Sequence, residues 1–234
     1  MATAKMSTVP ALAECTSAAS DFSTAPVLIT VGETKQHFYV HEPVLRAASR
    51  FFEAALDKEW LERQTRVVNL PESNPEAFTV YVNWLYFGRL FVDDEPSVPP
   101  ESKQMFEILV RAYLLGDQLL DVAFKDAAVD AFGQETLKLY EGIRYLPGAI
   151  PRHLLYENSL PTAPLRRLVV RRLTMFQNAS NIKEDEPSAF LHDVIQALVH
   201  RDTPTVDDFV QELADCKYHE HEAGAENCYR SKRR

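Results

Sequence analysis

Two short runs with the pattern of β-strands constrain the fold more than any other feature of the chain. Val27 to Val31 is an apolar run that stops at Gly32, and Gln36 to Val40 resumes the strand pattern almost at once. Two such runs joined by a short glycine-containing turn predict a β-hairpin. Beyond residue 70, apolar residues recur mainly at three- and four-residue spacing, which indicates helices. The sequence therefore predicts an α+β fold, in which a small β-sheet packs on a helical cluster.

Boundary signals divide the rest of the chain into segments. Residues 65–70 (TRVVNL) form a short predicted strand that ends at a proline. Proline is favoured in the first turn of a helix and glycine just beyond its end, so these residues mark the expected helix limits. Gly88 and Gly116 each end a predicted helix. The expected helices begin near Pro43, Pro75, Ser102, Asp117, Pro164, Pro187 and Thr205.

Composition and charge limit the classes of partner. The chain has 234 residues, a net charge of −9 and 7 glycines. An acidic chain has no general attraction to nucleic acid or to an anionic membrane, and no apolar run approaches the length of a membrane span. The cysteines are Cys15, Cys216 and Cys228, too few for a disulfide framework, which favours a reducing compartment. We expect a cytoplasmic or nuclear protein that binds neither nucleic acid nor membrane.

Two stretches of the chain resemble a known family. They read VLITVGETKQHFYVHEPVLRAASRFFEAAL and VVNLPESNPEAFTVYVNWLYFGRL. The first has a hairpin that ends in His and a helix with Leu, Ser and aromatic residues, and the second has an aromatic helix that ends Tyr-x-Gly. Together they resemble a BTB/POZ domain. The matching residues are His41, Leu45, Ser49, Phe51, Phe52, Pro75, Phe78, Leu85, Tyr86 and Gly88.

The resemblance implies how the chain is divided. We expect a disordered tail over residues 1–25, because it is rich in Ala, Ser and Thr and has little apolar surface to bury. A BTB/POZ domain follows over 26–135, and a helical C-terminal extension over 136–215 that looks like the extension of stand-alone BTB proteins. Residues 216–234 are polar, and we expect a disordered tail there as well.

The resemblance also implies a function. BTB/POZ domains are non-catalytic protein–protein interaction modules, which points to an adaptor or scaffold with a client protein that the sequence does not identify. Cullin-binding members carry a hydrophobic-x-Glu motif after the first helix of the domain, where this chain has Trp60 and Glu62. This favours a substrate adaptor of a cullin-type ubiquitin ligase. The alternative is a homo-oligomeric scaffold or a transcription-related regulator without a link to a ligase.

Self-association is expected for the same reason. Many BTB domains dimerise through the hairpin and first helix, and in this chain that region presents Leu45, Phe51 and Phe52. We therefore predict a homodimer with these three residues as interface candidates. No catalytic residues are assigned, because His41, His153 and His200 have no serine or cysteine nearby in a supporting motif.

Two further clusters carry chemistry with more than one interpretation. Cys216, His219, His221 and Cys228 form the pattern C-x2-H-x-H-x6-C, whose ligand types suit tetrahedral zinc. The spacing is not that of a common zinc module, so a polar tail without a metal or other cofactor is the favoured interpretation.

A basic stretch is the other cluster, and packing with salt bridges is favoured there over nucleic-acid binding because its members scatter around a helix. They are Arg166, Arg167, Arg171 and Arg172.

Overall fold

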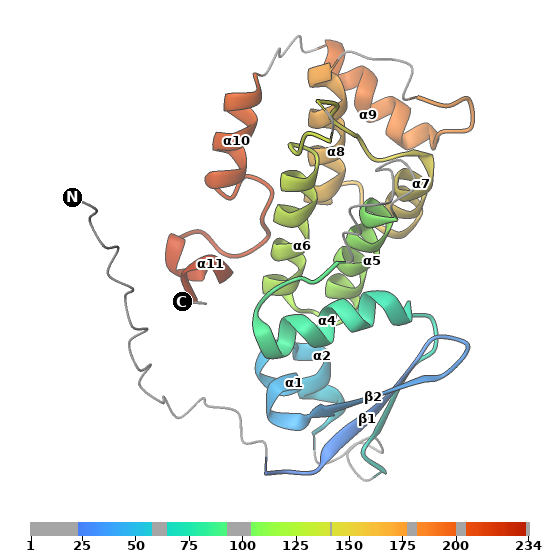
Figure 1. Cartoon of the computed structure of the whole chain (residues 1–234), viewed down its shortest axis with the longest axis vertical. Helices are drawn as coiled ribbons and strands as arrows, with labels where there is room; N and C mark the ends of the chain where they lie inside the picture. Colours follow the sequence, from blue (N-terminus) through green and yellow to red (C-terminus); the bar gives the residue numbers. More distant parts are fainter. Residues whose placement is uncertain are drawn as a thin grey trace, which may run out of the picture.

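The computed structural model describes residues 23–57, 65–92, 104–140, 142–176, 182–199 and 205–232. Most of the predicted N-terminal tail, residues 1–22, therefore lies outside the described part of the chain. Within that part, a three-stranded sheet lies at one end of the molecule and helices extend away from it (Figure 1). This confirms the predicted α+β architecture with an all-helical C-terminal part.

The sheet has the strand order β2-β1-β3. Strands β1 (Pro26–Val31) and β2 (Gln36–His41) pair antiparallel, and β1 pairs in parallel with β3 (Val67–Leu70). Alternate residues of β1 are fully buried, because successive side chains of a strand point to opposite faces. The predicted hairpin and the third strand are both confirmed. Gly32, in the turn, has a φ of 75°, a conformation that glycine adopts without strain.

The first helical region is divided at Ser49. The sequence predicts one helix, but α1 (Glu42–Ala48) ends there and α2 (Arg50–Ala55) begins. The Ser49 hydroxyl accepts a hydrogen bond from the Phe52 amide at 3.1 Å and donates one to the Leu119 carbonyl at 2.6 Å. The serine thus caps α2 and is held by a distant part of the chain, which favours the break.

Helix α4 (Pro75–Phe87) matches its sequence prediction at both ends. The Asn74 side chain accepts a hydrogen bond from the Ala77 amide at 2.9 Å, and Gly88 ends the helix in the left-handed conformation. In Figure 1 the helix lies between the sheet and the upright helices. Its Phe78 ring lies 4.8 Å from that of Phe38 in β2, measured between centroids. Helix α4 therefore joins the sheet to the helical cluster.

Helices α5 (Met105–Gln118) and α6 (Val122–Glu135) form the centre of that cluster. The prediction that the first of them stops at Gly116 was wrong. A Cβ atom on Gly116 would lie 3.1 Å from the Cβ atom of Lys125 in α6. The glycine therefore allows two helices to approach closely, a role that a sequence pattern does not distinguish from a helix end.

The remaining elements are helical and share one apolar core with the sheet and α4–α6. Helix α7 contributes Arg152, which forms a buried ion pair with Glu186, the residue two positions before α9. The elements are α7 (Ala149–Asn158), α8 (Pro164–Phe176), α9 (Ser188–Val199), α10 (Val206–Ala214), the 3-10 helix η3 (Ala225–Asn227) and α11 (Tyr229–Lys232). Among the described residues, the structure has no helix of the length and apolarity that crossing a membrane requires.

The end of the described chain differs from the sequence prediction. Residues 216–232, here called the C-terminal segment, were expected to be a disordered polar tail. In the structure this segment turns back and lies beside α6 (Figure 1). Tyr218 and Cys228 are almost fully buried, at 3% and 4% exposed. Several of its polar side chains pair with residues of α5 and α6, and such long-range pairing leaves no periodic signal in the sequence.

Candidate functional site

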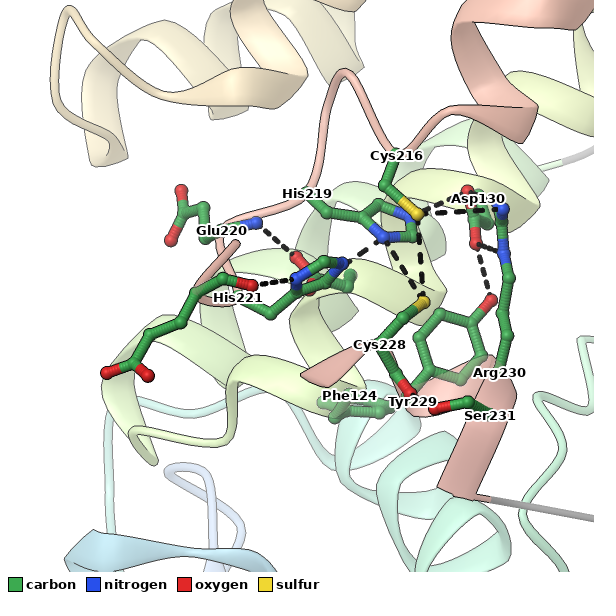
Figure 2. A network of polar contacts seen from close by, with 12 residues as sticks. Phe124, Asp130, Cys216, His219, Glu220, His221, Cys228, Tyr229, Arg230 and Ser231 are labelled. Carbon is green, nitrogen blue, oxygen red and sulfur yellow. Dashed lines mark hydrogen bonds and ion pairs between the residues drawn. The ribbon is translucent and has the colours of Figure 1, made fainter. Parts of the chain in front are cut away.

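The most concentrated group of chemically active side chains lies in the C-terminal segment. Cys216, His219, His221 and Cys228 each direct one ligand atom to a common centre, and these atoms all lie within 4.8 Å of one another (Figure 2). The two Sγ atoms are 3.8 Å apart, and Cys228 Sγ lies 3.7 Å from His219 Nδ1. This sulfur–sulfur distance is far beyond the roughly 2.05 Å of a disulfide. The four residues are a candidate metal centre, which we call the Cys/His cluster.

The local backbone brings the cluster together. Cys216 follows α10 directly and has a φ of 58°, a left-handed conformation that is uncommon for any residue other than glycine. A turn closes next, in which the His219 amide donates to the Cys216 carbonyl at 3.0 Å. Helix η3 then returns the chain so that Cys228 faces the same centre. Strained backbone of this kind is often kept at functional sites.

Asp130 of α6 contacts the cluster through the His219 ring. Its carboxylate lies 2.9 Å from His219 Nε2, and it accepts hydrogen bonds from the Tyr229 hydroxyl at 2.5 Å and from Arg230 Nε at 2.8 Å. Burial alone would raise the pKa of this carboxyl, but the hydrogen bonds from His219, Arg230 and Tyr229 outweigh burial, so the pKa lies below its ordinary value. Asp130 is therefore an anion that orients the His219 ring.

Glu220 fastens the same segment to α6 on the other side. Its backbone amide donates to Asp126 at 2.8 Å, and its carboxylate accepts from Lys125 Nζ at 2.5 Å and from the Tyr113 hydroxyl at 3.2 Å. Asp126 and Asp130 are both almost fully buried. Burial raises the pKa of Asp126, and the Glu220 amide and the neighbouring His219 only partly oppose this rise. The segment thus lies on a buried polar face of α6.

The Cys216 thiol is protonated at neutral pH when no metal is bound. Burial, and then the nearby Cys228, raises its pKa to about 11. The thiolate is the reactive form of a cysteine, so Cys216 without a metal is a weak nucleophile.

Sequence reasoning found the four cluster residues but not the residues that support them. Asp126 and Asp130 lie four positions apart on one face of α6, and neither was singled out from the sequence. The signal was present, because two acidic residues at that spacing in an otherwise apolar helix are uncommon in a protein interior. Their partners in the C-terminal segment were not predictable from spacing.

The cullin-type residues Trp60 and Glu62 lie outside the described residues. They belong to the connection between α2 and β3, whose described ends are Asp57 and Thr65. Both of these end residues are exposed. The sequence interpretation of Trp60 and Glu62 as a partner-binding pair stays a prediction.

The structure places the dimer-interface candidates mainly inside a single chain. Leu45 and Phe52 are fully buried in the core, and Phe51 packs against that core while remaining partly exposed. The rings of Phe51 and Phe52 contact each other at a centroid distance of 5.2 Å. The prediction of an interface through this region stays untested, but of the three only Phe51 is accessible to a second chain without a change in the fold.

Three arginines of α8 make polar contacts within the chain, and the fourth, Arg167, is exposed. Arg166 Nη2 donates to the Tyr156 carbonyl at 2.7 Å, and Arg171 pairs with Glu212 of α10 at 2.5 Å. Arg172 Nη2 donates to the Thr136 carbonyl at 2.7 Å. These contacts link α8 to α7, to α10 and to the residue that follows α6. They support the packing interpretation of the basic stretch.

Two of the residues that carry the family resemblance contact each other between β2 and α4. The Tyr86 hydroxyl lies 2.8 Å from His41 Nδ1 and accepts a hydrogen bond from the His41 amide at 3.1 Å. It ties the end of the hairpin to the end of α4.

Residues 19–121 match the family model described as BTB/POZ domain. The chain carries a BTB/POZ domain. A search of curated proteins found no match.

The family match covers the sheet and helices α1, α2, α4 and α5, and it ends immediately before α6. BTB/POZ domains are generally interaction modules rather than enzymes, and they commonly self-associate and bind other proteins. The protein is therefore a protein–protein interaction module with a helical C-terminal extension. The Cys/His cluster lies outside the matched residues but packs against the helix that follows them.

Proposed function

We propose that the protein is an adaptor that recruits a client protein to a cullin-type ubiquitin ligase. The observation that carries this proposal is the BTB/POZ domain, together with Trp60-Leu61-Glu62 in the connection that follows α2. An aromatic side chain can fill a pocket on a partner, and a carboxylate beside it can accept hydrogen bonds at the rim. The helical extension provides the additional surface that a client would need.

The placement of the connection supports this role. Phe52, near its start, and Val68, just after its end, are almost fully buried, so both flanking elements are fixed to the core. Asp57 and Thr65, at the limits of the connection, are exposed. A binding motif held between two fixed elements loses less freedom on association than one in a free tail.

Direct binding to purified cullins tests the proposal. Glu62→Ala removes the rim carboxylate, and we expect affinity to fall roughly thirtyfold, which corresponds to about 2 kcal/mol. The matched control is Glu53→Ala, because Glu53 is an exposed glutamate on α2. The control should bind like the wild type, and both variants should keep the thermal stability of the wild type. A wild-type chain that binds no cullin, or a folded Glu62→Ala variant with unchanged affinity, contradicts the proposal.

A homo-oligomeric scaffold is the second candidate function. The sheet has β2 and β3 at its edges, and Tyr39 on β2 is 64% exposed. An edge strand with exposed aromatic surface is a common place for association between chains. Sedimentation equilibrium at about 10 µM, where weak dimers begin to form, should show a two-chain species. A species with the mass of one chain at that concentration contradicts self-association.

A further inference from the structure

The geometry of the Cys/His cluster matches a particular metal site. With zinc–sulfur bonds of about 2.3 Å and zinc–nitrogen bonds of about 2.0–2.1 Å, the ligand atoms of a tetrahedral site lie about 3.8 Å (S to S) and about 3.6 Å (S to N) apart. The observed distances are 3.8 Å between the sulfur atoms and 3.7 Å from Cys228 Sγ to His219 Nδ1. All four ligand atoms lie within 4.8 Å of one another, so small side-chain rotations would complete the site.

The second ring nitrogen of each histidine lies within 3 Å of an oxygen atom, as is common for metal ligands. Histidines that bind metals usually donate their other ring N–H to a carboxylate or a backbone carbonyl. His219 Nε2 faces Asp130 at 2.9 Å, and His221 Nδ1 lies 2.7 Å from the Glu222 carbonyl. These contacts leave His219 Nδ1 and His221 Nε2 with lone pairs toward the centre (Figure 2). His221 Nε2 is buried and has no hydrogen-bond partner in the described structure.

A purely structural alternative explains these contacts less well. Two thiols at 3.8 Å form at most a weak hydrogen bond, and they are not joined by a disulfide in this structure. The left-handed backbone at Cys216 brings one of them to this position at a conformational cost. A bound cation would pair with both sulfur atoms and with the orphaned nitrogen of His221 together.

We propose that Cys216 Sγ, His219 Nδ1, His221 Nε2 and Cys228 Sγ bind one Zn²⁺ ion. Two thiolates and two neutral imidazoles in a tetrahedron are the ligands that zinc favours. All four positions are filled by the protein, which is the pattern of a structural site and leaves no open position for a substrate. On binding, each thiol loses its proton to solvent, so one Zn²⁺ replaces two protons.

The ion would fasten the C-terminal segment to the helix that follows the BTB/POZ domain. Asp130 connects the site to α6 through His219, and the Tyr229 ring contacts that of Trp84 in α4 at a centroid distance of 5.5 Å. Tyr218, on the other side, packs against Phe209 of α10. The site therefore links the last helices of the extension to the core of the interaction module.

Metal content of the full chain is the first test. Protein purified under reducing conditions without chelator should contain close to one zinc per chain, measured by inductively coupled plasma mass spectrometry. Cys228→Ser should lose most of that zinc. The matched control is Cys15→Ser, because Cys15 is the one cysteine of the sequence outside the cluster, and this variant should keep the full complement. A wild-type chain that takes up no zinc from an equimolar solution, a Cys228→Ser variant with full zinc, or stoichiometric copper or iron instead would overturn the proposal.

Cobalt provides a test that does not depend on the folding of a variant. The wild-type chain, stripped of metal and loaded with Co²⁺, should show the visible bands of a tetrahedral ion and a thiolate-to-cobalt charge-transfer band. A spectrum of hexa-coordinate cobalt without that band contradicts the ligand set. Chelation should also raise hydrogen exchange in residues 216–232 while β1 and β2 remain protected, since the metal binds only one of these regions. Unchanged exchange in the segment after complete metal removal would contradict the structural role.

Asp130 is a positioning residue in this scheme, because it acts on the metal through His219. Asp130→Asn should lower zinc affinity by about 10–100-fold, measured by competition with a chromophoric chelator. Excess zinc should restore protection of the segment in this variant. A variant with the affinity of the wild type would remove Asp130 from the site.

Discussion

The sheet and the C-terminal segment are held in place by different forces. In the sheet, Val27, Ile29 and Val31 of β1 are fully buried, and they belong to the same apolar core as the aromatic residues of α4. The C-terminal segment is polar, and it is fixed to α6 mainly through Asp130 and Glu220. One region is stabilised by removing apolar surface from water, and the other by charged groups that must be paired in a buried place.

This difference has a consequence for how the two regions respond to change. Apolar burial is non-directional and tolerates substitutions that conserve volume. A buried polar network depends on every partner, because an unpaired buried charge is costly. We therefore expect that damage to the sheet unfolds the whole molecule, whereas damage to the segment opens it locally.

The largest effect is expected in the apolar core. Phe78→Ala removes a fully buried ring that contacts β2, and we expect the free energy of unfolding to fall by about 4 kcal/mol. Chemical denaturation followed by circular dichroism should show a single transition at lower denaturant. If only the C-terminal segment became exposed in this variant, the contrast between the two regions would be wrong.

A buried ion pair in the extension should give the next largest effect. Glu186→Ala leaves the guanidinium of Arg152 buried and without its carboxylate, which costs about 3 kcal/mol. Arg152→Met combined with Glu186→Leu removes both charges and should recover most of the lost stability. Thermal melts of the two variants measure the difference, and equal losses would contradict the argument from desolvation.

The same pair predicts the sign of a pH effect. Burial alone raises the pKa of Glu186, but hydrogen bonds from Arg152 and the Lys183 amide outweigh it, so the pKa lies below its ordinary value of 4.5. A lowered folded pKa means that the stabilisation is present above about pH 4.5 and is lost as the pH falls through the folded value. The free energy of unfolding, measured at decreasing pH, should show this loss in the wild type and not in the Arg152→Met/Glu186→Leu double variant.

A smaller effect is expected where the C-terminal segment meets α6. Tyr229→Phe removes the hydroxyl that donates to Asp130 at 2.5 Å, and hydrogen bonds to a charged acceptor contribute about 2 kcal/mol. We expect faster hydrogen exchange in residues 216–232 and little change in the melting of the sheet. Equal destabilisation of β1 would show that the segment and the sheet unfold as one unit.

The smallest effect is expected at the start of α10. Thr205 and Asp208 form a capping box, in which each side chain accepts a hydrogen bond from the other residue's amide. Thr205→Ala should cost about 1 kcal/mol, and Thr205→Ser should cost less because it keeps the hydroxyl. Differential scanning calorimetry measures the stability of the two variants. An equal loss of stability in both would contradict a capping role for the Thr205 hydroxyl.

The sequence was most informative where local chemistry decides the structure. The strand patterns at 27–31 and 36–40 became β1 and β2, and Asn74 and Gly88 became the caps of α4 as predicted. Asn74 and Gly88 act on their immediate neighbours, so the sequence contains nearly all the information that is needed. Ser49 and Gly116 were misjudged for the opposite reason, because their roles depend on Leu119 and Lys125 in packed structure.

The sequence by itself determined the α+β architecture, the BTB/POZ resemblance and the residue types of the Cys/His cluster. Only the tertiary structure decided that this cluster converges and that Asp130 supports it, because Asp130 and Arg230 are 100 residues apart in the chain. Apolar periodicity repeats along an element and can be read from one segment. A buried polar contact between distant residues forms once, and it depends on the packing of every helix between them.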